Sequence, residues 1–240
     1  MVEAIITMNT EYAAALQPDD LSRLLQLASP LLPVGAYAYS QGLEWAIETN
    51  TVRDASSTAG WIADVIEIYF CRFELPVLWR MRKAWDKKDI GALKQWNHGY
   101  CAGRDTAEAR AETLQMGYSL VRLLDDIDLD TESLMLLERF APVSFPLAYA
   151  CATSVWRIPA HSALHAYLWS WAENQVSAAM KAVPLGQVAG QRMLLEIGAR
   201  IPAAVKIACA LPDEELSNFA PGLSIASARH ETQYSRLFRS

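Results

Sequence analysis

Apolar residues recur at steps of three and four along most of the chain, which is the pattern of helices that bury one face. The clearest case runs from Arg104 to Leu124, where Ala107, Leu114 and Val121 fall on one seam. Proline and glycine mostly fall between such segments, and no sustained strand alternation occurs. We therefore predict an all-α, single-domain bundle of about ten helices. The expected helices cover 18–28, 40–50, 54–70, 76–85, 89–100, 104–124, 131–140, 146–156, 159–181 and 187–210.

The pattern divides the chain into three parts. Residues 1–20 form an N-terminal segment of uncertain order, and residues 21–211 form the helical domain. After Pro212 the sequence becomes polar and irregular, so residues 212–240 are expected to be a tail that is flexible or ordered by a partner. The segment 159–181 holds only two formal charges, Glu173 and Lys181. A helix that is apolar nearly all round is central to a bundle or covered by a second subunit.

An unusual connection lies between the first two helices, at residues 28–44. Pro30 ends the first helix, because a proline disfavours helical dihedrals in the residue before it. Tyr37 and Tyr39 make the connection too aromatic for an ordinary solvated linker. Ser40 is expected to cap the next helix, with Glu44 in its first turn facing the positive end of the helix dipole.

Composition and charge narrow the function. The chain has 240 residues, a hydrophobic content of 52% with eight Trp, and a net charge of −6. The apolar content suggests surface that a partner covers, and the acidic balance argues against nucleic-acid binding. The four cysteines form no CxxC pair, and neither a secretion signal nor a run long enough to span a membrane is present. A cytoplasmic protein is the expectation.

Few residues suggest chemistry of their own. No phosphate-binding glycine motif and no nucleophile elbow occur. His161 and His165 lie one turn apart, but Ser162 stands where a zincin has Glu, and no third ligand is evident. We therefore predict no metal site. Arg104, Glu108 and Arg110 are interpreted as exposed helical pairs.

Two features at the ends of segments favour partner binding. Lys181 ends the apolar helix, where it either complements the helix dipole or meets a bound anion or partner carboxylate. The last residues mix arginines with the anchor types enriched at interfaces, so the tail is expected to fold on a partner or to dock against the chain's own loop. These residues are Arg229, Tyr234, Arg236, Leu237, Phe238 and Arg239.

Four blocks in order resemble the urease accessory protein UreF family. The first runs from Ala28-Ser29-Pro30 through Leu32-Pro33-Val34-Gly35 to Tyr39-Ser40-Gln41-Gly42-Leu43-Glu44, and the second from Arg104 through Leu114-Gln115-Met116-Gly117 to Ser119-Leu120. The third comprises Trp171, Asn174-Gln175-Val176-Ser177-Ala178-Ala179, Lys181 and Pro184-Leu185-Gly186-Gln187, and the fourth is residues 229–240.

This resemblance implies an all-helical, dimeric chaperone of nickel insertion with no enzymatic activity. It also implies complexes with UreD (called UreH in some organisms), with the GTPase UreG and with apo-urease. Nickel would be cargo, and no cofactor would be bound stably.

The resemblance also implies roles for individual residues. The residues expected to face the GTPase are Tyr37, Ser40, Glu44, Arg104 and Lys181. Those expected to face UreD are Arg229, His230, Glu231, Tyr234, Arg236, Leu237 and Phe238. The sequence departs from the family pattern at Ala36, Asp105 and Ala228, where Gly, Glu and Met are more usual. The shorter carboxylate of Asp105 leaves its pairing in doubt.

One mechanistic hypothesis links the first and last blocks. Arg236 would donate hydrogen bonds to backbone carbonyls at Tyr37 and Tyr39, which would lock the loop into the shape that the GTPase reads. Two other classes remain open from the residues alone. One is a helical metal-dependent enzyme that uses His161 and His165, and the other is a generic helical scaffold.

Overall fold

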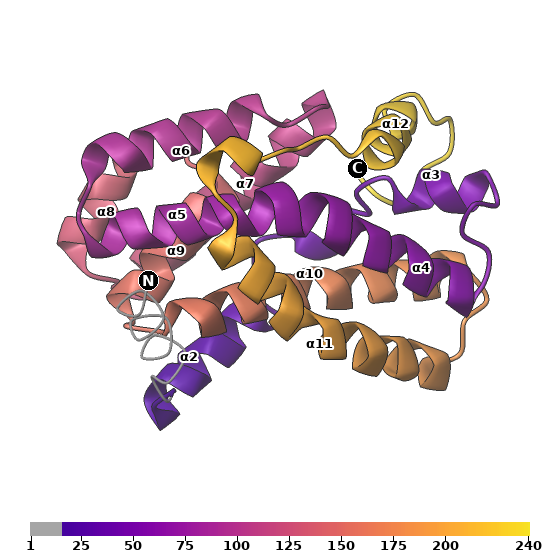
Figure 1. Cartoon of the computed structure of the whole chain (residues 1–240), viewed down its shortest axis with the longest axis horizontal. Coiled ribbons are helices and arrows are strands. Elements are labelled where there is room, and N and C mark those ends of the chain that lie inside the picture. Colours follow the sequence, from indigo (N-terminus) through magenta and orange to yellow (C-terminus); the bar gives the residue numbers. More distant parts are fainter. Residues whose placement is uncertain (1–15) are drawn as a thin grey trace.

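The structure, a computed structural model, describes residues 16–240, and these residues form a bundle of helices with no strand among them (Figure 1). The predicted all-α bundle is confirmed. Residues 1–15 of the predicted N-terminal segment lie outside the described residues, and the proposed division of the chain stays a prediction. In chain order the elements are α2 (Pro18–Ala28), η1 (Ala36–Ala38), α3 (Leu43–Glu48), α4 (Ala55–Val65), η2 (Ile66–Glu74), α5 (Leu75–Asp86), α6 (Ile90–Ala102), α7 (Ala107–Asp126), α8 (Thr131–Glu138), α9 (Phe145–Val155), α10 (Ala160–Ala182), α11 (Gln187–Ala210), η3 (Asp213–Glu215) and α12 (Pro221–His230).

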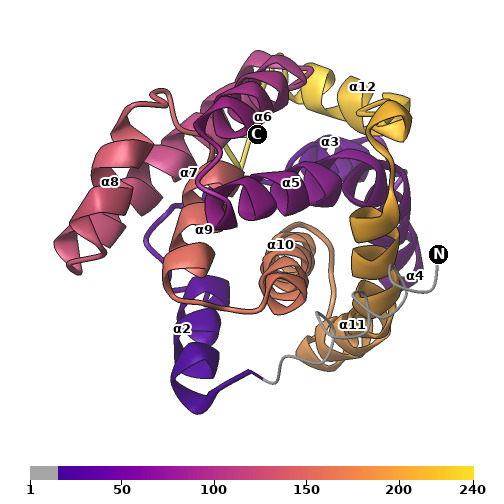
Figure 2. The same cartoon turned by 60° about the vertical axis from the view of Figure 1, so that its left-hand side comes forward.

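Helix α10 is the centre of the bundle. Figure 2 shows it surrounded by α2, α5, α9 and α11, and it contacts each of these helices as well as α3 and α4. Its Leu164, Leu168 and Ala172 are completely buried. The apolar segment 159–181 is therefore central within this one chain, which is the first of the two predicted arrangements.

Polar side chains fix where several helices begin. Asp54 accepts a hydrogen bond from the Ser57 amide at 2.8 Å, and the Ser57 hydroxyl accepts one from the Asp54 amide, which confirms the predicted start of α4. Glu44 lies in the first turn of the next helix as expected, and its amide donates to the Ser40 hydroxyl at 3.4 Å, but Ser40 does not begin that helix. Gln41 and Gly42 have φ angles of 53° and 81°, which are left-handed, so α3 starts only at Leu43.

A π-helical turn joins α4 to α5 where the sequence predicted a break at Pro76. Proline has no amide hydrogen to donate to the carbonyl four residues earlier. The carbonyl of Arg72 instead accepts from the amide of Ser217, at 3.1 Å. The helical path continues through η2 and places Tyr69 and Glu74 in the interior.

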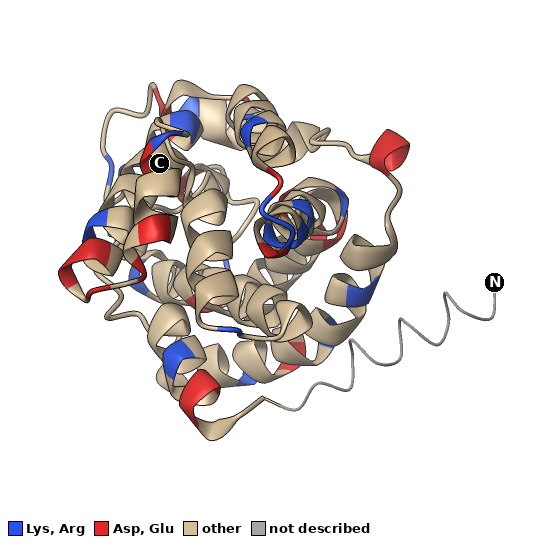
Figure 3. Ribbon diagram, turned by 90° about the vertical axis from the view of Figure 1, so that its left-hand side faces the viewer, with Lys and Arg blue, Asp and Glu red and all other residues tan. Residues whose placement is uncertain are grey.

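The last part of the chain differs from the expectation of irregular structure. Residues Pro221–His230 form α12, which packs against α3, and the chain end lies beside both helices in Figure 1. Of the two predictions for the end of the tail, docking against the chain's own loop is the arrangement seen here. Acidic and basic residues are interspersed over the view in Figure 3. Within residues 16–240, no helix has the length and apolarity that a membrane span requires.

Candidate functional site

A buried carboxylate, Glu74, collects four donors inside the bundle. Tyr167 donates to Oε1 at 2.6 Å, Tyr69 donates to Oε2 at 3.0 Å, and Tyr100 lies 2.8 and 2.9 Å from the two oxygens. Arg104 adds an ion pair at 3.2 Å. We call these five residues the Glu74 cluster. They come from η2, α6, α10 and the connection before α7, so the cluster joins elements far apart in sequence.

The protonation of the Glu74 cluster is fixed by burial and charge. Burial raises the pKa of Tyr69, Tyr100 and Tyr167 well above the ordinary range, so the three phenols stay protonated donors. Burial alone would lower the pKa of Arg104, but the neighbouring tyrosines and Glu74 raise it on balance. The two charges of the cluster, on Glu74 and Arg104, are thus paired with each other.

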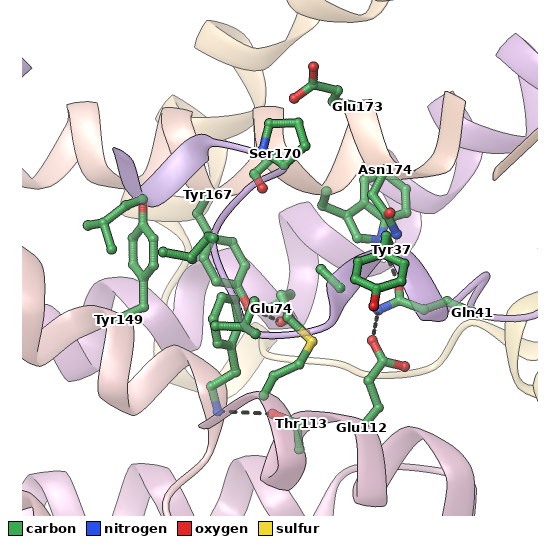
Figure 4. Close-up of a pocket in the computed structure, with 18 of the residues that line it drawn as sticks. Tyr37, Gln41, Glu74, Glu112, Thr113, Tyr149, Tyr167, Ser170, Glu173 and Asn174 are labelled. Carbon is green, nitrogen blue, oxygen red and sulfur yellow. Dashed lines mark hydrogen bonds between the residues drawn. The ribbon is translucent and has the colours of Figure 1, made fainter. Parts of the chain in front are cut away.

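A cavity of about 190 Å³ lies above the Glu74 cluster, between α10, α7 and the loop 29–37 (Figure 4). Its walls are aromatic and aliphatic for the most part. They also include three carboxylates, one basic side chain and several neutral polar groups. The lining residues that matter below are Tyr37, Phe70, Glu112, Tyr149, Tyr167, Trp171, Glu173 and Asn174.

A second polar chain leads from the cavity to the end of the protein. Trp171 donates to Gln41 at 2.6 Å, and Gln41 donates to Glu112 at 2.5 Å. The other oxygen of Glu112 accepts from the Ser240 hydroxyl at 2.9 Å. Burial raises the pKa of Glu112, although Arg104 and these hydrogen bonds oppose the rise. The cavity wall and the last residue therefore share one carboxylate.

The C-terminal segment (residues 231–240) is held by Glu44 of α3. Glu44 accepts from the backbone amides of Leu237 at 2.7 Å and Phe238 at 3.0 Å. The fully buried ring of His230 lies 3.1 Å from Glu44 through Nε2 and 2.9 Å from Glu108 through Nδ1. Each ring nitrogen of His230 therefore faces one carboxylate. We call these residues the C-terminal dock. Its members are Ser40, Glu44, Glu108, His230, Arg236, Leu237, Phe238 and Ser240.

Glu108, near the start of α7, also binds the C-terminal segment. Its second oxygen accepts from Arg236 at 2.5 Å, and its backbone amide donates to Glu231 at 3.0 Å. The carboxylate of Glu231 also sits at the positive end of α7. The interpretation of Arg104 and Glu108 as exposed helical pairs is therefore wrong, because one is buried in the Glu74 cluster and the other binds the C-terminal segment. Arg110 is exposed as expected.

The loop and the C-terminal segment meet through backbone groups. The main-chain oxygen of Ser240 accepts from the Ser40 amide and hydroxyl, both at 2.6 Å, and the Arg239 amide donates to the Ala38 carbonyl at 2.7 Å. Gly42 lies so close to α12 that a Cβ there would be 3.0 Å from Ala226 and Ser227, in addition to requiring its positive φ. The hypothesis that Arg236 binds carbonyls at Tyr37 and Tyr39 is wrong in detail, because Glu108 attracts that guanidinium.

Exposure separates the residues predicted to face the GTPase. Ser40 and Glu44 are buried in the C-terminal dock, and the guanidinium of Arg104 is buried in the Glu74 cluster. Tyr37 is 66% exposed at the cavity mouth. Lys181 is exposed too, and its ammonium lies 5.7 Å from the ring centre of Phe238, a cation–π contact.

The residues predicted to face UreD also fall into two groups. His230 and Phe238 are buried anchors, whereas Arg229, Glu231, Tyr234, Arg236 and Leu237 are exposed. Asp105, whose pairing was in doubt, accepts from Ser224 at 2.5 Å and from Asn218 at 3.2 Å, and so helps to hold α12.

Of the Glu74 cluster, only Arg104 was singled out from the sequence. Glu74, Tyr100 and Tyr167 lie in different helices, and each alone looks like an ordinary amphipathic position. A signal did exist at Glu74, because a carboxylate directly before the apolar Leu75-Pro76-Val77-Leu78 run is poorly placed for solvent.

The two histidines of the metal hypothesis border a different surface cavity. The ring centres of His161 and Trp79 lie 5.1 Å apart, and burial lowers the pKa of His165. Across residues 16–240, no group of three or more His, Cys, Asp or Glu side chains is arranged to hold a metal ion. The pair therefore has no third ligand in the described chain.

Comparison with known proteins agrees with the sequence blocks. The family model described as UreF matches residues 52–198. The chain is 58% identical over 221 residues to the urease accessory protein UreF of Methylobacillus flagellatus, which covers 92% of this chain and 97% of that protein. It is 56% identical over 237 residues to the protein of the same name from Azoarcus sp., covering 97% and 100% of the two chains.

Proposed function

The chain belongs to the UreF family of urease accessory proteins, and from this membership we propose that it is a chaperone of urease maturation that binds UreD and recruits or modulates the GTPase UreG during nickel insertion into apo-urease. In this proposal the chain carries out no catalytic step and binds no cofactor stably, and nickel is cargo of the assembled complex. The observation that carries it is the C-terminal dock, which presents exposed side chains on an internally fixed backbone.

The dock supports a division of labour among the predicted interaction residues. Buried Glu44, Ser40 and Phe238 hold the backbone, so they would act on a partner through shape. Exposed Tyr234 and Leu237 would make direct contact, since large apolar side chains in water are typical of interface anchors. We assign these two, with Arg229, Glu231 and Arg236, to the UreD side.

We assign Tyr37, at the cavity mouth, and Lys181, beside the Phe238 ring, to UreG. The loop that carries Tyr37 is joined to the C-terminal segment by the backbone hydrogen bonds of Ser240 and Arg239. Binding of UreD to the C-terminal segment would therefore change the position of the Tyr37 loop through those hydrogen bonds. Arg104 would support this surface from below rather than contact the GTPase.

A homodimer in the cytoplasm completes the proposal. Helix α11 exposes Val188 and Leu195 two turns apart on one face, and we propose that a second copy covers this face. All four cysteines are free thiols, which fits a reducing compartment.

Co-purification with tagged UreD and UreG tests the proposal, with restoration of urease activity in a strain lacking this protein as the functional measurement. We expect wild-type chain to be retained by UreD and to restore activity. Replacement of Tyr234 and Leu237 by Ala should weaken retention by roughly tenfold or more, because two exposed anchors are lost while folding is untouched.

Met135→Ala is the matched control, because Met135 is an exposed apolar residue on α8, away from the dock. It should leave both retention and activity unchanged. Wild-type protein that neither binds UreD nor restores urease activity would contradict the proposed function. Equal retention of the double variant would contradict the assignment of Tyr234 and Leu237.

A further inference from the structure

The cavity above the Glu74 cluster carries an excess of negative charge. Glu74, Glu112 and Glu173 all line it, while Arg104 is its one basic lining residue. Arg104 forms its ion pair with Glu74. Among residues 16–240, neither Glu112 nor Glu173 has a Lys, Arg or His within ion-pair distance.

The two unpaired carboxylates lie at different depths. Glu173 is partly exposed and lies at the mouth, whereas the side chain of Glu112 is buried further in (Figure 4). Burial raises the pKa of both carboxylates; Arg104 and two hydrogen bonds oppose the rise at Glu112, whereas burial is the one cause at Glu173. A cation that enters the cavity would be attracted first by Glu173 and then by Glu112.

The walls between these carboxylates suit a planar cation on an aliphatic stem. Tyr37, Phe70, Tyr149, Tyr167 and Trp171 border the same space. Aromatic rings attract guanidinium groups and stack on them, and they do so more readily than with the strongly hydrated ammonium of lysine. Leu32, Val34 and Met116 supply apolar wall against which a propyl stem can pack.

The mouth of the cavity indicates that the cation belongs to a protein. Leu31, in the loop beside the mouth, is 90% exposed, and Tyr37 at the rim is 66% exposed. Large exposed apolar residues around a pocket are typical of a protein interface, where they exclude water around a central anchor. Arginine is among the residue types enriched as such anchors.

We propose that this cavity receives an arginine side chain of a partner protein, whose guanidinium passes Glu173 and pairs with Glu112 between the aromatic walls. The inference rests on the proposed function only in that it requires a protein partner. It adds an acceptor site on the loop side of the dock and the chemistry of the group that fills it.

Titration of the purified chain with n-butylguanidinium, followed by NMR, tests the site without any partner. We expect saturable shifts confined to the cavity, weaker binding of n-butylammonium and no saturable binding of pentanoate. Glu112→Gln should weaken the binding of n-butylguanidinium by roughly tenfold, because a charge-assisted hydrogen bond is replaced by a neutral one. Glu173→Gln, which is at the more exposed rim, should weaken it by about two- to fivefold.

Glu138→Gln is the control, since Glu138 is an exposed carboxylate on α8. The Glu138→Gln variant should bind n-butylguanidinium as tightly as wild type does. Because Glu112 also holds Gln41 and Ser240, the Glu173 variant keeps the test valid if the Glu112 variant folds poorly. Absence of saturable n-butylguanidinium binding by wild type, or equal binding by wild type and Glu173→Gln, would overturn the inference.

A competition experiment separates this inference from the proposed function. If the cavity is an arginine receptor, n-butylguanidinium should lower the co-purification of wild-type chain with UreD or UreG, and Glu173→Gln should lower it too. Retention of both partners at wild-type level under both conditions would overturn the receptor and leave the proposed function standing. Failure of the wild-type chain to bind any partner, with n-butylguanidinium still bound, would instead contradict the proposed function.

Discussion

Two buried carboxylates, Glu74 and Glu44, use the same physics for different purposes. Glu74 accepts only from side chains, three tyrosines and Arg104, and all of them belong to the body of the bundle. Glu44 accepts from two backbone amides and His230, which belong to the end of the chain. Both satisfy the rule that a buried charge must be paired and hydrogen-bonded.

The difference between these sites lies in what each can release. The three tyrosine donors to Glu74 sit on η2, α6 and α10, so the Glu74 cluster cannot open unless these helices separate. The amides bound by Glu44 belong to residues after α12 that have no helical hydrogen bonds of their own. Segments of that kind can open locally without global unfolding. We infer that Glu74 maintains the fold, whereas Glu44 controls the shape of the C-terminal dock, the surface that we propose faces partners.

The largest expected effect comes from Glu74→Ala. Removal of the carboxylate leaves Arg104 and three phenols buried without their acceptor, which should lower the free energy of unfolding by about 3–5 kcal/mol. Urea denaturation followed by far-UV circular dichroism measures this loss. Glu138→Ala, at an exposed position on α8, should change stability by less than about 0.5 kcal/mol.

A loss below about 1 kcal/mol for Glu74→Ala would remove the contrast between the two carboxylates. It would mean that water or neighbouring side chains satisfy Arg104 once Glu74 is absent. The Glu74 cluster would then be dispensable for the fold.

Helix positions were predictable from the sequence because local rules govern them. The cap at Asp54, the helix of residues 187–210 and the central place of 159–181 follow from capping chemistry and from an apolar surface that must be buried. The start of α3 was missed because it depends on the left-handed backbone at Gln41 and Gly42. That conformation is set by contact with α12 and Ser240, more than 180 residues away.

The candidate site was predictable only in outline. The resemblance selected Glu44, Arg104 and Arg236 among others, and the structure places these three in hydrogen-bonded networks. It did not select the partners: Glu108, rather than loop carbonyls, binds Arg236. Nothing local distinguishes these alternatives, because both lie far from Arg236 in sequence and both are acceptors. Arg236 pairs with Glu108 because the fold brings this negative charge close to the guanidinium.

The second prediction concerns Glu44→Ala, which should loosen the dock and leave the bundle intact. The amides of Leu237 and Phe238 would lose their acceptor and His230 would lose one partner, which should lower the free energy of local opening by about 1–3 kcal/mol. Hydrogen exchange read by mass spectrometry should show faster exchange at Leu237 and Phe238, while peptides from α5 and α10 keep their protection. Glu48→Ala, one turn further along α3 and exposed, is the matched control and should change neither.

Uniformly faster exchange in α5 and α10 of the Glu44 variant would contradict the inference that Glu44 affects only the C-terminal dock. It would make the dock part of the global folding unit. The buried Phe238 and its neighbours Leu43 and Val183 would then count as core rather than as a docking site.

The smallest expected effect is a pH dependence that arises from Glu112, the residue shared by the cavity and the dock. Burial raises the pKa of Glu112, so the folded protein keeps this proton over a pH range in which the unfolded chain has released it. The resulting stability is fully present below the unfolded pKa and is lost as the pH rises through the folded pKa. Glu112→Gln cannot ionise, so stability should fall less steeply above pH 5 in the variant than in wild type. Urea midpoints of both proteins between pH 5 and 8 measure the difference, in which all other titrating groups cancel. Parallel curves would show that Glu112 titrates alike in both states and that its charge is already compensated, which would also remove one support for a cation in the cavity.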